Sequence, residues 1–336
     1  MHRPLRRLAP ALAAVAVAGL LGACGGDDSS TDATASSSSS EAQSLEDVTL
    51  RVGVQKDGIR AVLNRSGQLE DVPYEIEFST FQFGPPLVEA AGADQIDLAW
   101  VGSTPPIFGA AAGSNFKIIA AVQEADSQEN SILVPKESDI ASLQDLAGKT
   151  VAVPKGSSAH GMLLKALERG GVDDQEVDFA FLAPADALAA FQSGSVDALT
   201  IWDPFVQQVQ QSLGAEVVEA GPPDEIGVGF EIASSKALED PLKREAIADY
   251  VGRLRKGWEW AAANQDGWAE AWSEDSGLPL EVTQEAVKHK VSEIVPVSQE
   301  ILDHQQSLAD LLTEKGVLPG EVTFSDIVDE TVLEEG

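Results

Sequence analysis

The sequence of 336 residues predicts an α/β fold with two lobes, mainly parallel sheets and a helical C-terminal tail. The first reason is that short runs rich in β-branched residues alternate with helical patterns. The second is that this alternation stops near Ser234, after which long amphipathic patterns follow one another. The third is length, because about 290 residues remain after an N-terminal leader, enough for two lobes of ordinary domain size.

The N-terminus has the pattern of an export signal. Basic residues within positions 1–7 precede an apolar run from Leu8 to Leu21, which is too short to span a bilayer comfortably. The run ends in Leu21-Gly-Ala-Cys24, which resembles the processing site of bacterial lipoproteins. We therefore expect a signal peptide over residues 1–23 and a lipid anchor on Cys24, the only cysteine of the chain.

A disordered tether is expected over residues 24–47, because this segment is rich in serine and aspartate and has too little apolar surface to fold. The folded body then begins near Val48. The whole chain carries 22 basic and 55 acidic residues, a formal net charge of −33, and the predicted signal contains three of the arginines and no acid. Such acidity argues against binding to nucleic acid or to an anionic membrane surface.

The body is expected to begin with strands in crossover units. The predicted strands share short β-branched runs and lie at residues 48–54, 74–78, 96–100, 117–122, 131–134, 150–153, 177–181 and 198–201. Short helices are predicted between them, at residues 86–91, 105–112, 142–147, 158–170, 184–193 and 204–213. The tail is predicted to contain no strand, only helices at residues 241–264, 267–274, 280–290 and 298–315.

Two extended stretches, residues 131–134 and 229–233, are the predicted crossings between the lobes. They divide the body into lobe 1, formed by residues 48–133 and 234–336 with the C-terminal helices, and lobe 2, formed by residues 134–233.

Neither a cofactor nor a metal ion is expected. The chain contains no G-x-x-x-x-G-K-[ST] phosphate loop and no G-x-G-x-x-G after a predicted strand. Its histidines outside the signal, His160, His289 and His304, are scattered and do not follow the spacing of zinc ligands.

Residues 155–161 form a predicted turn between a strand and a helix, and their free amides would point at whatever fills a cleft between the lobes. A helix N-terminus carries about half a positive charge, and a hydrogen bond to a charged group contributes roughly 1.5 to 3 kcal/mol. Several such bonds would account for micromolar binding of an anion, which needs about 8 kcal/mol. The alternative is that Ser157 or Ser158 only caps the helix.

Five segments in this order carry a family resemblance: Val52-Gly-Val-Gln-Lys56, Gly102-Ser-Thr-Pro-Pro106, Pro154-Lys-Gly-Ser-Ser-Ala-His160, Leu182-Ala-Pro-Ala-Asp-Ala187 and Ile201-Trp-Asp-Pro-Phe205. The chain resembles the aliphatic sulfonate, taurine and nitrate binding proteins of ATP-binding cassette (ABC) importers, and the sulfonate branch in particular. The resemblance implies a periplasmic-binding-protein fold of type II, with the ligand between the lobes. It also implies a monomeric, extracytoplasmic receptor that delivers its ligand to a permease with ATPase subunits.

The resemblance also implies a set of ligand-binding residues, drawn from both lobes: Gln55, Ser103, Thr104, Ser157, Ser158, His160, Trp202, Asp203 and Phe230. Serine, threonine and amide groups would face the anion, while Trp202 and Phe230 would form an apolar side. Structural roles remain open for several of them, because Trp202 is compatible with a core position and Asp203 with a helix cap before Pro204.

The small organic anion expected from this resemblance is an aliphatic sulfonate, taken up as a source of sulfur. Taurine, nitrate, bicarbonate and an uncharged or aromatic solute remain alternatives, and Asp203 would be available to pair with the ammonium group of taurine. A hydrolase that uses Ser158 is the alternative of another class, but residues 156–160 do not match the G-x-S-x-G nucleophile turn. We expect binding without catalysis, and a ligand that favours the closed state by bridging both lobes.

Overall fold

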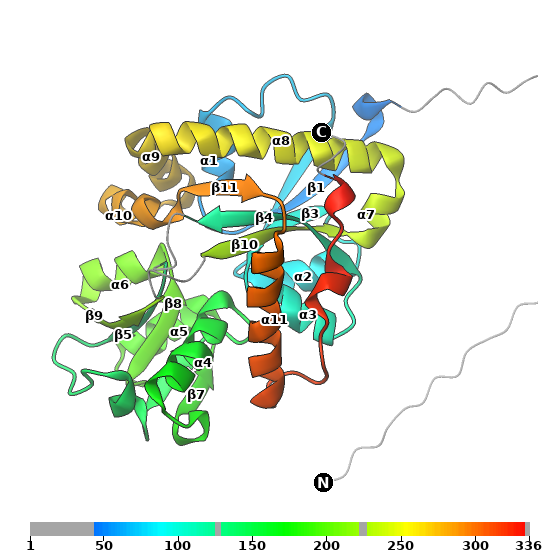
Figure 1. The fold of residues 1–336 in the computed structure, drawn as a ribbon. Coiled ribbons are helices and arrows are strands. Elements are labelled where there is room, and N and C mark those ends of the chain that lie inside the picture. Colours follow the sequence, from blue (N-terminus) through cyan, green and yellow to red (C-terminus); the bar gives the residue numbers. More distant parts are fainter. Residues whose placement is uncertain (1–43, 125–128, 222–226, 333–336) are drawn as a thin grey trace, which may run out of the picture. The chain divides into compact units, whose positions relative to one another are not determined.

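Two β-sheets form the centre of the fold in the computed structural model, which describes residues 44–124, 129–221 and 227–332 (Figure 1). The first sheet contains β1 (Thr49–Val54), β2 (Glu75–Thr80), β3 (Leu98–Gly102), β4 (Phe116–Glu124), β10 (Val228–Ser234) and β11 (Ser292–Val295), in the order β11-β4-β10-β3-β1-β2. The second contains β5 (Asn130–Val134), β6 (Thr150–Val153), β7 (Asp178–Phe181), β8 (Ala198–Trp202) and β9 (Glu216–Ala220), in the order β7-β6-β8-β5-β9. The α/β class expected from the sequence is confirmed.

Helices mostly alternate with strands up to β10, and the four helices α7 to α10 then follow one another, as predicted. The earlier ones are α1 (Ile59–Arg65), α2 (Gly84–Gly92), α3 (Pro105–Ala111), α4 (Ser158–Gly170), α5 (Pro184–Gln192) and α6 (Phe205–Leu213). The C-terminal ones are α7 (Ser235–Glu239), α8 (Pro241–Ala263), α9 (Gln265–Ser276), α10 (Leu280–Lys290) and α11 (Gln299–Glu314). Short 3₁₀ turns complete the set: η1 (Leu45–Asp47), η2 (Leu143–Leu146), η3 (Asp174–Glu176), η4 (Phe324–Ile327) and η5 (Glu330–Val332).

Both sheets are mixed, which corrects the prediction of mainly parallel sheets. β1 pairs in parallel with β2 and β3, and β6 with β7 and β8. However, β10 runs antiparallel to both β3 and β4, and β5 runs antiparallel to β8 and β9. The reason is that β5 and β10 are the first strands after the chain changes sheets. Each enters its sheet from the end opposite to the one at which its neighbouring strands begin.

The two extended stretches predicted as crossings are these same strands, β5 of the second sheet and β10 of the first. The chain passes from the first sheet to the second between Glu124 and Asn130, and it returns between Ala220 and Val228. β11 is a further correction, because no strand was expected after Ser234. It pairs with β4 at the edge of the first sheet.

The first sheet is covered on both faces. Side chains of β1 and β3, such as Leu50 and Leu98, share a core with α1, α8, α9 and α10. On the other face, Ala99 and Val101 of β3 pack with α2, α3 and α11. The second sheet has its own core with α4, α5 and α6. Because β3 alternates between two buried faces, its five residues are all buried, as expected for a central strand.

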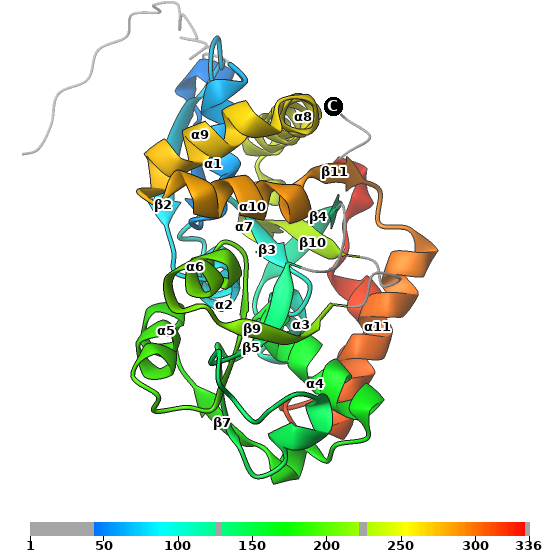
Figure 2. The same cartoon turned by 90° about the vertical axis from the view of Figure 1, so that its left-hand side faces the viewer.

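The C-terminal helices contact both halves of the fold. α8 extends along the first sheet, and α11 lies beside α4 of the second (Figures 1 and 2). Lys315, just after α11, forms an ion pair of 2.9 Å with Asp174 near the end of α4. On another side, Gln211 of α6 donates a hydrogen bond of 3.0 Å to the carbonyl oxygen of Glu281 in α10. The tail therefore connects the two sheets on two sides.

The predicted signal peptide, the anchor residue Cys24 and most of the predicted tether lie outside the described residues. The last residues of the predicted tether form the 3₁₀ turn η1, whose Leu45 packs against the core of the first sheet. Residues 45–47 of the predicted tether are therefore part of the folded body. In the part of the chain that the structure describes, no helix is both long and apolar enough to cross a membrane.

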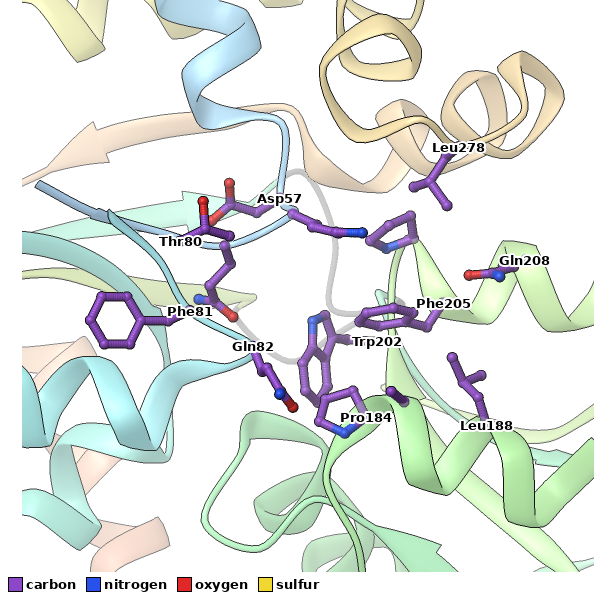
Figure 3. A pocket seen from close by; sticks show the side chains of 14 residues that line it. Asp57, Thr80, Phe81, Gln82, Pro184, Leu188, Trp202, Phe205, Gln208 and Leu278 are labelled. Atoms are coloured by element: carbon purple, nitrogen blue, oxygen red, sulfur yellow. The ribbon is translucent and has the colours of Figure 1, made fainter. Parts of the chain in front are cut away.

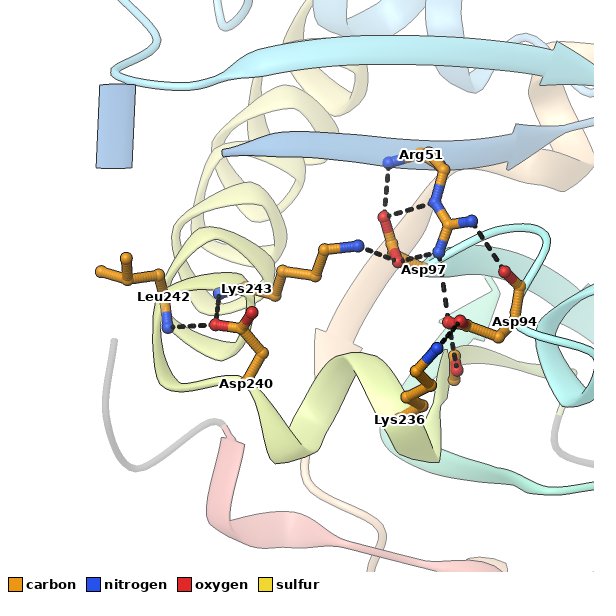
Figure 4. A network of polar contacts seen from close by, with 8 residues as sticks. Arg51, Asp94, Asp97, Lys236, Asp240, Leu242 and Lys243 are labelled. Atoms are coloured by element: carbon orange, nitrogen blue, oxygen red, sulfur yellow. Dashed lines mark hydrogen bonds and ion pairs between the residues drawn. The ribbon is translucent and has the colours of Figure 1, made fainter. Parts of the chain in front are cut away.

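A buried carboxylate joins three segments of the first half of the fold (Figure 4). The side chain of Asp97, before β3, is fully buried and accepts hydrogen bonds from the backbone N–H of Arg51 at 2.8 Å and its guanidinium at 2.6 Å. Lys243 of α8 approaches the same carboxylate at 2.8 Å. Burial by itself would raise the pKa of Asp97, but hydrogen bonds from Arg51 and Lys243 outweigh it and hold the pKa below its usual value.

Asp97→Asn should lower the free energy of unfolding by about 2 to 4 kcal/mol at neutral pH, because Arg51 and Lys243 lose their shared anion. Asp94→Asn is the matched control. Asp94 is more exposed and pairs with Lys236 at 2.7 Å, so its neutralisation should cost less than about 1 kcal/mol. Urea denaturation at several pH values measures both.

The depressed pKa of Asp97 stabilises the fold above the unfolded value of about 3.9, and this contribution is lost as the pH falls through the folded pKa. The difference between the wild-type protein and Asp97→Asn should therefore shrink in acid. Equal effects of the two substitutions at neutral pH would contradict the role assigned to Asp97.

Candidate functional site

A cavity of about 420 Å³ lies between loops of the two sheets (Figure 3). From the side of the first sheet it is lined by segments after β1 and β2, and from the side of the second by α5, the end of β8 and α6. Leu278, between α9 and α10, contributes to the wall as well. The complete lining is Gln55, Lys56, Asp57, Thr80, Phe81, Gln82, Pro184, Ala185, Leu188, Trp202, Pro204, Phe205, Gln208 and Leu278. Most of these side chains are apolar, and Lys56 is the only basic one among them.

A second, much smaller cavity of about 10 Å³ shares Gln55 and Trp202 with the large one. Its other lining residues are Gly84, Trp100, Gly102, Pro105, Glu129, Ser157 and Ser158. This volume corresponds to about one water molecule. The small cavity therefore places the N-terminus of α4 next to the apolar space in which a larger group would fit.

The N-terminus of α4 offers unsatisfied donors at this point. Ser157 is the cap residue, because its hydroxyl accepts from the N–H of His160 at 3.3 Å. Within the described part of the chain, the N–H groups of Ser158 and Ala159 have no hydrogen-bond partner. Backbone amides without a hydrogen-bond partner and the positive end of the helix dipole make this end of α4 suitable for an anion.

Glycines allow α4 to approach the turn between β3 and α3. A Cβ atom on Gly102 would lie 3.0 Å from Ser158, and one on Gly161 only 2.3 Å from Oγ1 of Thr104. Leu164 of α4 is buried in the core between α2, α3 and α11. α4 therefore packs against both halves of the fold, with its N-terminus held at their junction.

The polar residues predicted in the first half lie near this junction. Gln55 lines both cavities, and its side-chain amide donates to the carbonyl oxygen of Trp100 at 3.4 Å. Ser103 lies on another side of α4, in a cavity of about 50 Å³ that also contains Ser158. Thr104 is fully buried against Gly161, where it contacts α4 rather than open space. Of these three residues, only Gln55 lines the cavities of about 420 and 10 Å³, while Ser103 lines the neighbouring one of about 50 Å³.

Ser157 and Ser158 both line the small cavity, but their hydroxyl groups are already engaged. The Ser157 hydroxyl donates to the carbonyl oxygen of Pro154 at 2.7 Å, and that of Ser158 donates to Oδ1 of Asn130 at 3.1 Å. In this arrangement Ser158 presents its backbone N–H to the cavity as a donor. The capping role considered for Ser157 is present, and it coexists with a place in the cavity wall.

His160 is buried away from both cavities. Its Nδ1 accepts a hydrogen bond of 3.2 Å from the N–H of Gly156, and its ring packs among Phe108, Phe179 and Phe181. Burial, assisted by the positive charge of Lys155, lowers the pKa of His160 to about 4. A neutral ring can accept from Gly156 at neutral pH. The structure therefore gives His160 a role in holding the turn before α4.

The three remaining predicted residues, Trp202, Asp203 and Phe230, lie in three different environments. Trp202 lies in the wall of both cavities, with its ring edge-on to Phe205 at 5.8 Å. Asp203 is buried behind that wall, and its carboxylate accepts from Gln207. Burial raises the pKa of Asp203 to about 7. Phe230 is enclosed in the core against Phe324 at 5.5 Å, which places its ring outside both cavities.

A group of buried charges lies behind the small cavity. Lys290, at the end of α10, contacts Glu129 at 2.6 Å and lies 3.9 Å from Glu124. Deeper in the fold, burial raises the pKa of Glu231 to about 8, with a further contribution from Asp57. Burial also raises the pKa of Asp57, whose carboxylate accepts from the N–H of Ile59 at the start of α1. In the described residues, no group of three or more His, Cys, Asp or Glu side chains could hold a metal ion.

Comparison with known proteins identifies the family. The model of the family described as NMT1/THI5 like matches residues 86–267, more than half of the chain. The chain belongs to the NMT1/THI5-like family. The match begins at α2 and ends within α9, so it includes all of the second sheet and the α4 turn.

Relatives and solved structures of this family extend the similarity over nearly the whole chain. Two curated relatives carry the name "Putative aliphatic sulfonates-binding protein". The one from Escherichia coli (strain K12) is 33% identical over 96% of this chain and 97% of its own length. The one from Bacillus subtilis (strain 168) is 29% identical over 96% and 94%. The solved structure of the alkanesulfonate-binding protein SsuA from Xanthomonas axonopodis pv. citri bound to MOPS superposes with a TM-score of 0.79. It is 30% identical and covers 84% of this chain and 99% of its own.

Much of the wall of the large cavity consists of residues that were not expected at the site from the sequence. Phe81, Gln82 and Leu278 belong to loops that no strand or helix pattern singled out. Pro184 and Phe205 lie within two of the motifs on which the family resemblance rests, and this signal could have placed them at the site. Lys56 also ends one of these motifs.

Gly161→Ala should lower the free energy of unfolding by about 1 to 3 kcal/mol, because the new methyl group would overlap Oγ1 of Thr104. The clash must exceed the gain of about 1 kcal/mol that alanine gives over glycine inside a helix. Gly252→Ala in α8 is the control, since a Cβ there meets nothing within 4 Å and should be neutral or stabilising.

Chemical denaturation measures both variants, and Thr104→Ala combined with Gly161→Ala should recover part of the loss. If Gly161→Ala were as stable as Gly252→Ala, the close packing of α4 on the β3–α3 turn would be wrong.

Proposed function

We propose that this chain is the substrate-binding component of an ABC importer and that its ligand is an aliphatic sulfonate. The observation that carries the proposal is the amphiphilic site, in which the N-terminus of α4 adjoins an apolar cavity of about 420 Å³. The names of the relatives support it, because two are aliphatic sulfonates-binding proteins and a third binds MOPS, which is itself a sulfonate.

The sulfonate group would lie where the two cavities meet, between Gln55 and α4. Its oxygens would accept from the N–H groups of Ser158 and Ala159, and the Gln55 amide could turn from its long hydrogen bond of 3.4 Å to join them. Each charge-assisted bond contributes roughly 1.5 to 3 kcal/mol, so three of them supply about 5 to 9 kcal/mol, compared with the roughly 8 kcal/mol that micromolar binding needs. A sulfonate is larger than the small cavity, so Ser158 and Gln55 would have to separate slightly to admit it.

The tail of the ligand would occupy the large cavity, against Trp202, Phe205 and Leu188 (Figure 3). A buried methylene contributes about 0.8 kcal/mol, or roughly a fourfold gain in affinity. Nitrate and bicarbonate have no such group, and they would leave this space filled only by water. For this reason an anion with an apolar tail fits the site better than a small inorganic anion.

Taurine is supported less well than an alkanesulfonate. The Taurine-binding periplasmic protein of Escherichia coli (strain K12) is 28% identical over only 40% of this chain. Asp203, the residue considered for pairing with the ammonium group, is buried behind the cavity wall. The wall does contain Asp57, but its carboxylate accepts from the backbone of α1.

The geometry does not supply the parts of a serine hydrolase. Ser158 donates to Asn130 rather than to a histidine, and Nδ1 of His160 is occupied by the N–H of Gly156. The relatives named above are binding proteins, so we assign binding without catalysis.

The remaining parts of the proposal concern location and partners. The chain would be exported, attached to the membrane through acylated Cys24, and held away from it by the tether of residues 24–47. Ligand contacts from both halves of the fold would favour a closed form, because only differential contacts shift a conformational equilibrium. The closed monomer would then dock on a permease that works with ATPase subunits.

A ligand series tests the proposed substrate class. Thermal shift and titration calorimetry on the purified protein compare seven anions: methanesulfonate, 1-butanesulfonate, 1-octanesulfonate, taurine, sulfate, nitrate and butanoate. We expect 1-butanesulfonate to bind more tightly than methanesulfonate, by roughly fourfold per added methylene until the cavity is filled. At a hundredfold excess over Kd, a ligand should stabilise the fold by about 2.7 kcal/mol. Stabilisation by sulfate or nitrate and by none of the alkanesulfonates would contradict the proposal.

Cys24→Ala tests the anchor in the full-length chain expressed in a bacterium. The wild-type protein should partition into the detergent phase and the variant into the aqueous phase, because at least two acyl chains are needed for stable anchoring. Ser36→Ala in the tether is the control and should remain with the detergent. Detergent partitioning of the Cys24→Ala variant would contradict a lipid anchor at this residue.

A further inference from the structure

A carboxylate lies in the wall of the cavity that would receive the sulfonate. Glu129 precedes β5, is 3% exposed, and lines the small cavity together with Ser157 and Ser158. Two like charges 4 Å apart repel by about 4 kcal/mol at the effective dielectric constant of a partly buried site. That repulsion is as large as two of the hydrogen bonds that would hold the anion. A site with an uncompensated Glu129 would therefore reject a sulfonate.

Lys290 supplies the compensating charge from the C-terminal tail. Its side chain is only 4% exposed, and its Nζ lies 2.6 Å from Oε2 of Glu129 and 4.9 Å from the ring centre of Trp100. Burial by itself would lower the pKa of Lys290, but Glu129 and Glu124 outweigh it and raise the pKa above its ordinary value. Lys290 is therefore fully charged at neutral pH, and it reaches the cavity wall from behind.

The same pair is connected to α4 by hydrogen bonds. Nδ2 of Asn130 donates to Oε1 of Glu129 at 3.3 Å, and Oδ1 of Asn130 accepts from the hydroxyl of Ser158 at 3.1 Å. A continuous series of polar contacts thus leads from α10 to the N-terminus of α4, through Lys290, Glu129, Asn130 and Ser158. If Glu129 turned away from Lys290, Asn130 would lose the bond that fixes its amide, and Ser158 would lose its orientation.

We propose that Lys290 is a positioning residue for anion binding, which neutralises Glu129 and orients Ser158 without touching the ligand. The inference rests on the proposed function, because it assumes that the sulfonate lies at the N-terminus of α4. It goes further by assigning the affinity for anions partly to a residue of the C-terminal tail, far along the sequence from every residue that lines the small cavity.

Charge removal in a double-mutant cycle tests this role. Lys290→Met, Glu129→Gln and the double variant are prepared in the full chain, and their affinity for 1-butanesulfonate is measured by titration calorimetry. Lys290→Met should weaken binding by at least about thirtyfold, while Glu129→Gln should bind at least as tightly as the wild-type protein. The double variant should return to within about threefold of wild type, because it removes the cation together with the carboxylate that lines the small cavity.

Lys288→Met is the matched control on the same helix. Lys288 pairs with Glu285 on the surface, with 55% of its side chain exposed, and its loss should leave the affinity within about twofold of wild type. Lys290→Met leaves a buried carboxylate unpaired and could fail to fold. In that case Glu129→Gln and the double variant carry the test, since both must bind 1-butanesulfonate within about threefold of wild type or better.

The outcomes separate this inference from the proposed function. Failure of the wild-type protein to bind any alkanesulfonate would overturn both. Wild-type binding together with a Lys290→Met variant of unchanged affinity would overturn only the role of Lys290. A folded double variant that binds as weakly as Lys290→Met would also overturn the role of Lys290. In that case the lysine would have a purely structural role, and removing the carboxylate would not restore binding.

Discussion

The contact of α4 with the turn between β3 and α3 is the constraint on which the rest of the site depends. Glycine at position 102 of β3 leaves room for Ser158 of α4, and glycine at position 161 of α4 leaves room for Thr104. Leu164 packs in the core of the first half of the fold, while the other buried hydrophobic residues of α4 (Ala159, Leu163, Ala166 and Leu167) belong to the core of the second sheet. Because of this packing, the helix N-terminus is directed at the junction of the two halves, where a ligand can be reached from both.

Local charges and dipoles, not net charge, decide what such a site binds. The chain as a whole is strongly acidic, with a net charge of −33, and would repel an anion at long range. Screening at physiological salt limits that repulsion to roughly 8 Å, whereas the amides of α4 act at hydrogen-bond distance. Glu129 is the acid in the wall of the small cavity, and its ion pair with Lys290 would allow an acidic protein to present a neutral wall to the proposed anion.

The elements bounded by clear end signals could be predicted from the sequence. α4 begins after its cap Ser157 and ends before Gly171, which has a φ of 66°, and its predicted limits agree with the structure. β11 was not predicted, because it has four residues and depends on pairing with β4 rather than on its own pattern. α1, with seven residues, was not predicted either, and it depends on the surrounding core.

The candidate site was predicted in part, for a similar reason. Motif residues next to turns lie in the cavity walls: Gln55 follows β1, Trp202 ends β8 and Ser158 begins α4. Phe230 lies within β10, whose residues are all buried. The alternation of apolar and polar residues, which indicates the buried face of a strand, is therefore missing and could not show whether Phe230 faces a cavity or the core. The partnership of Glu129 with Lys290 joins residues 161 positions apart and has no local signal in the sequence.

The most direct measurement is a crystal structure of the protein with 1-butanesulfonate, with the sulfur located by its anomalous scattering. We expect a sulfonate group whose oxygens lie about 2.7 to 3.0 Å from the N–H nitrogens of Ser158 and Ala159, with the butyl chain against Trp202. A sulfonate bound away from the N-terminus of α4, or one whose tail points toward α4, would contradict it.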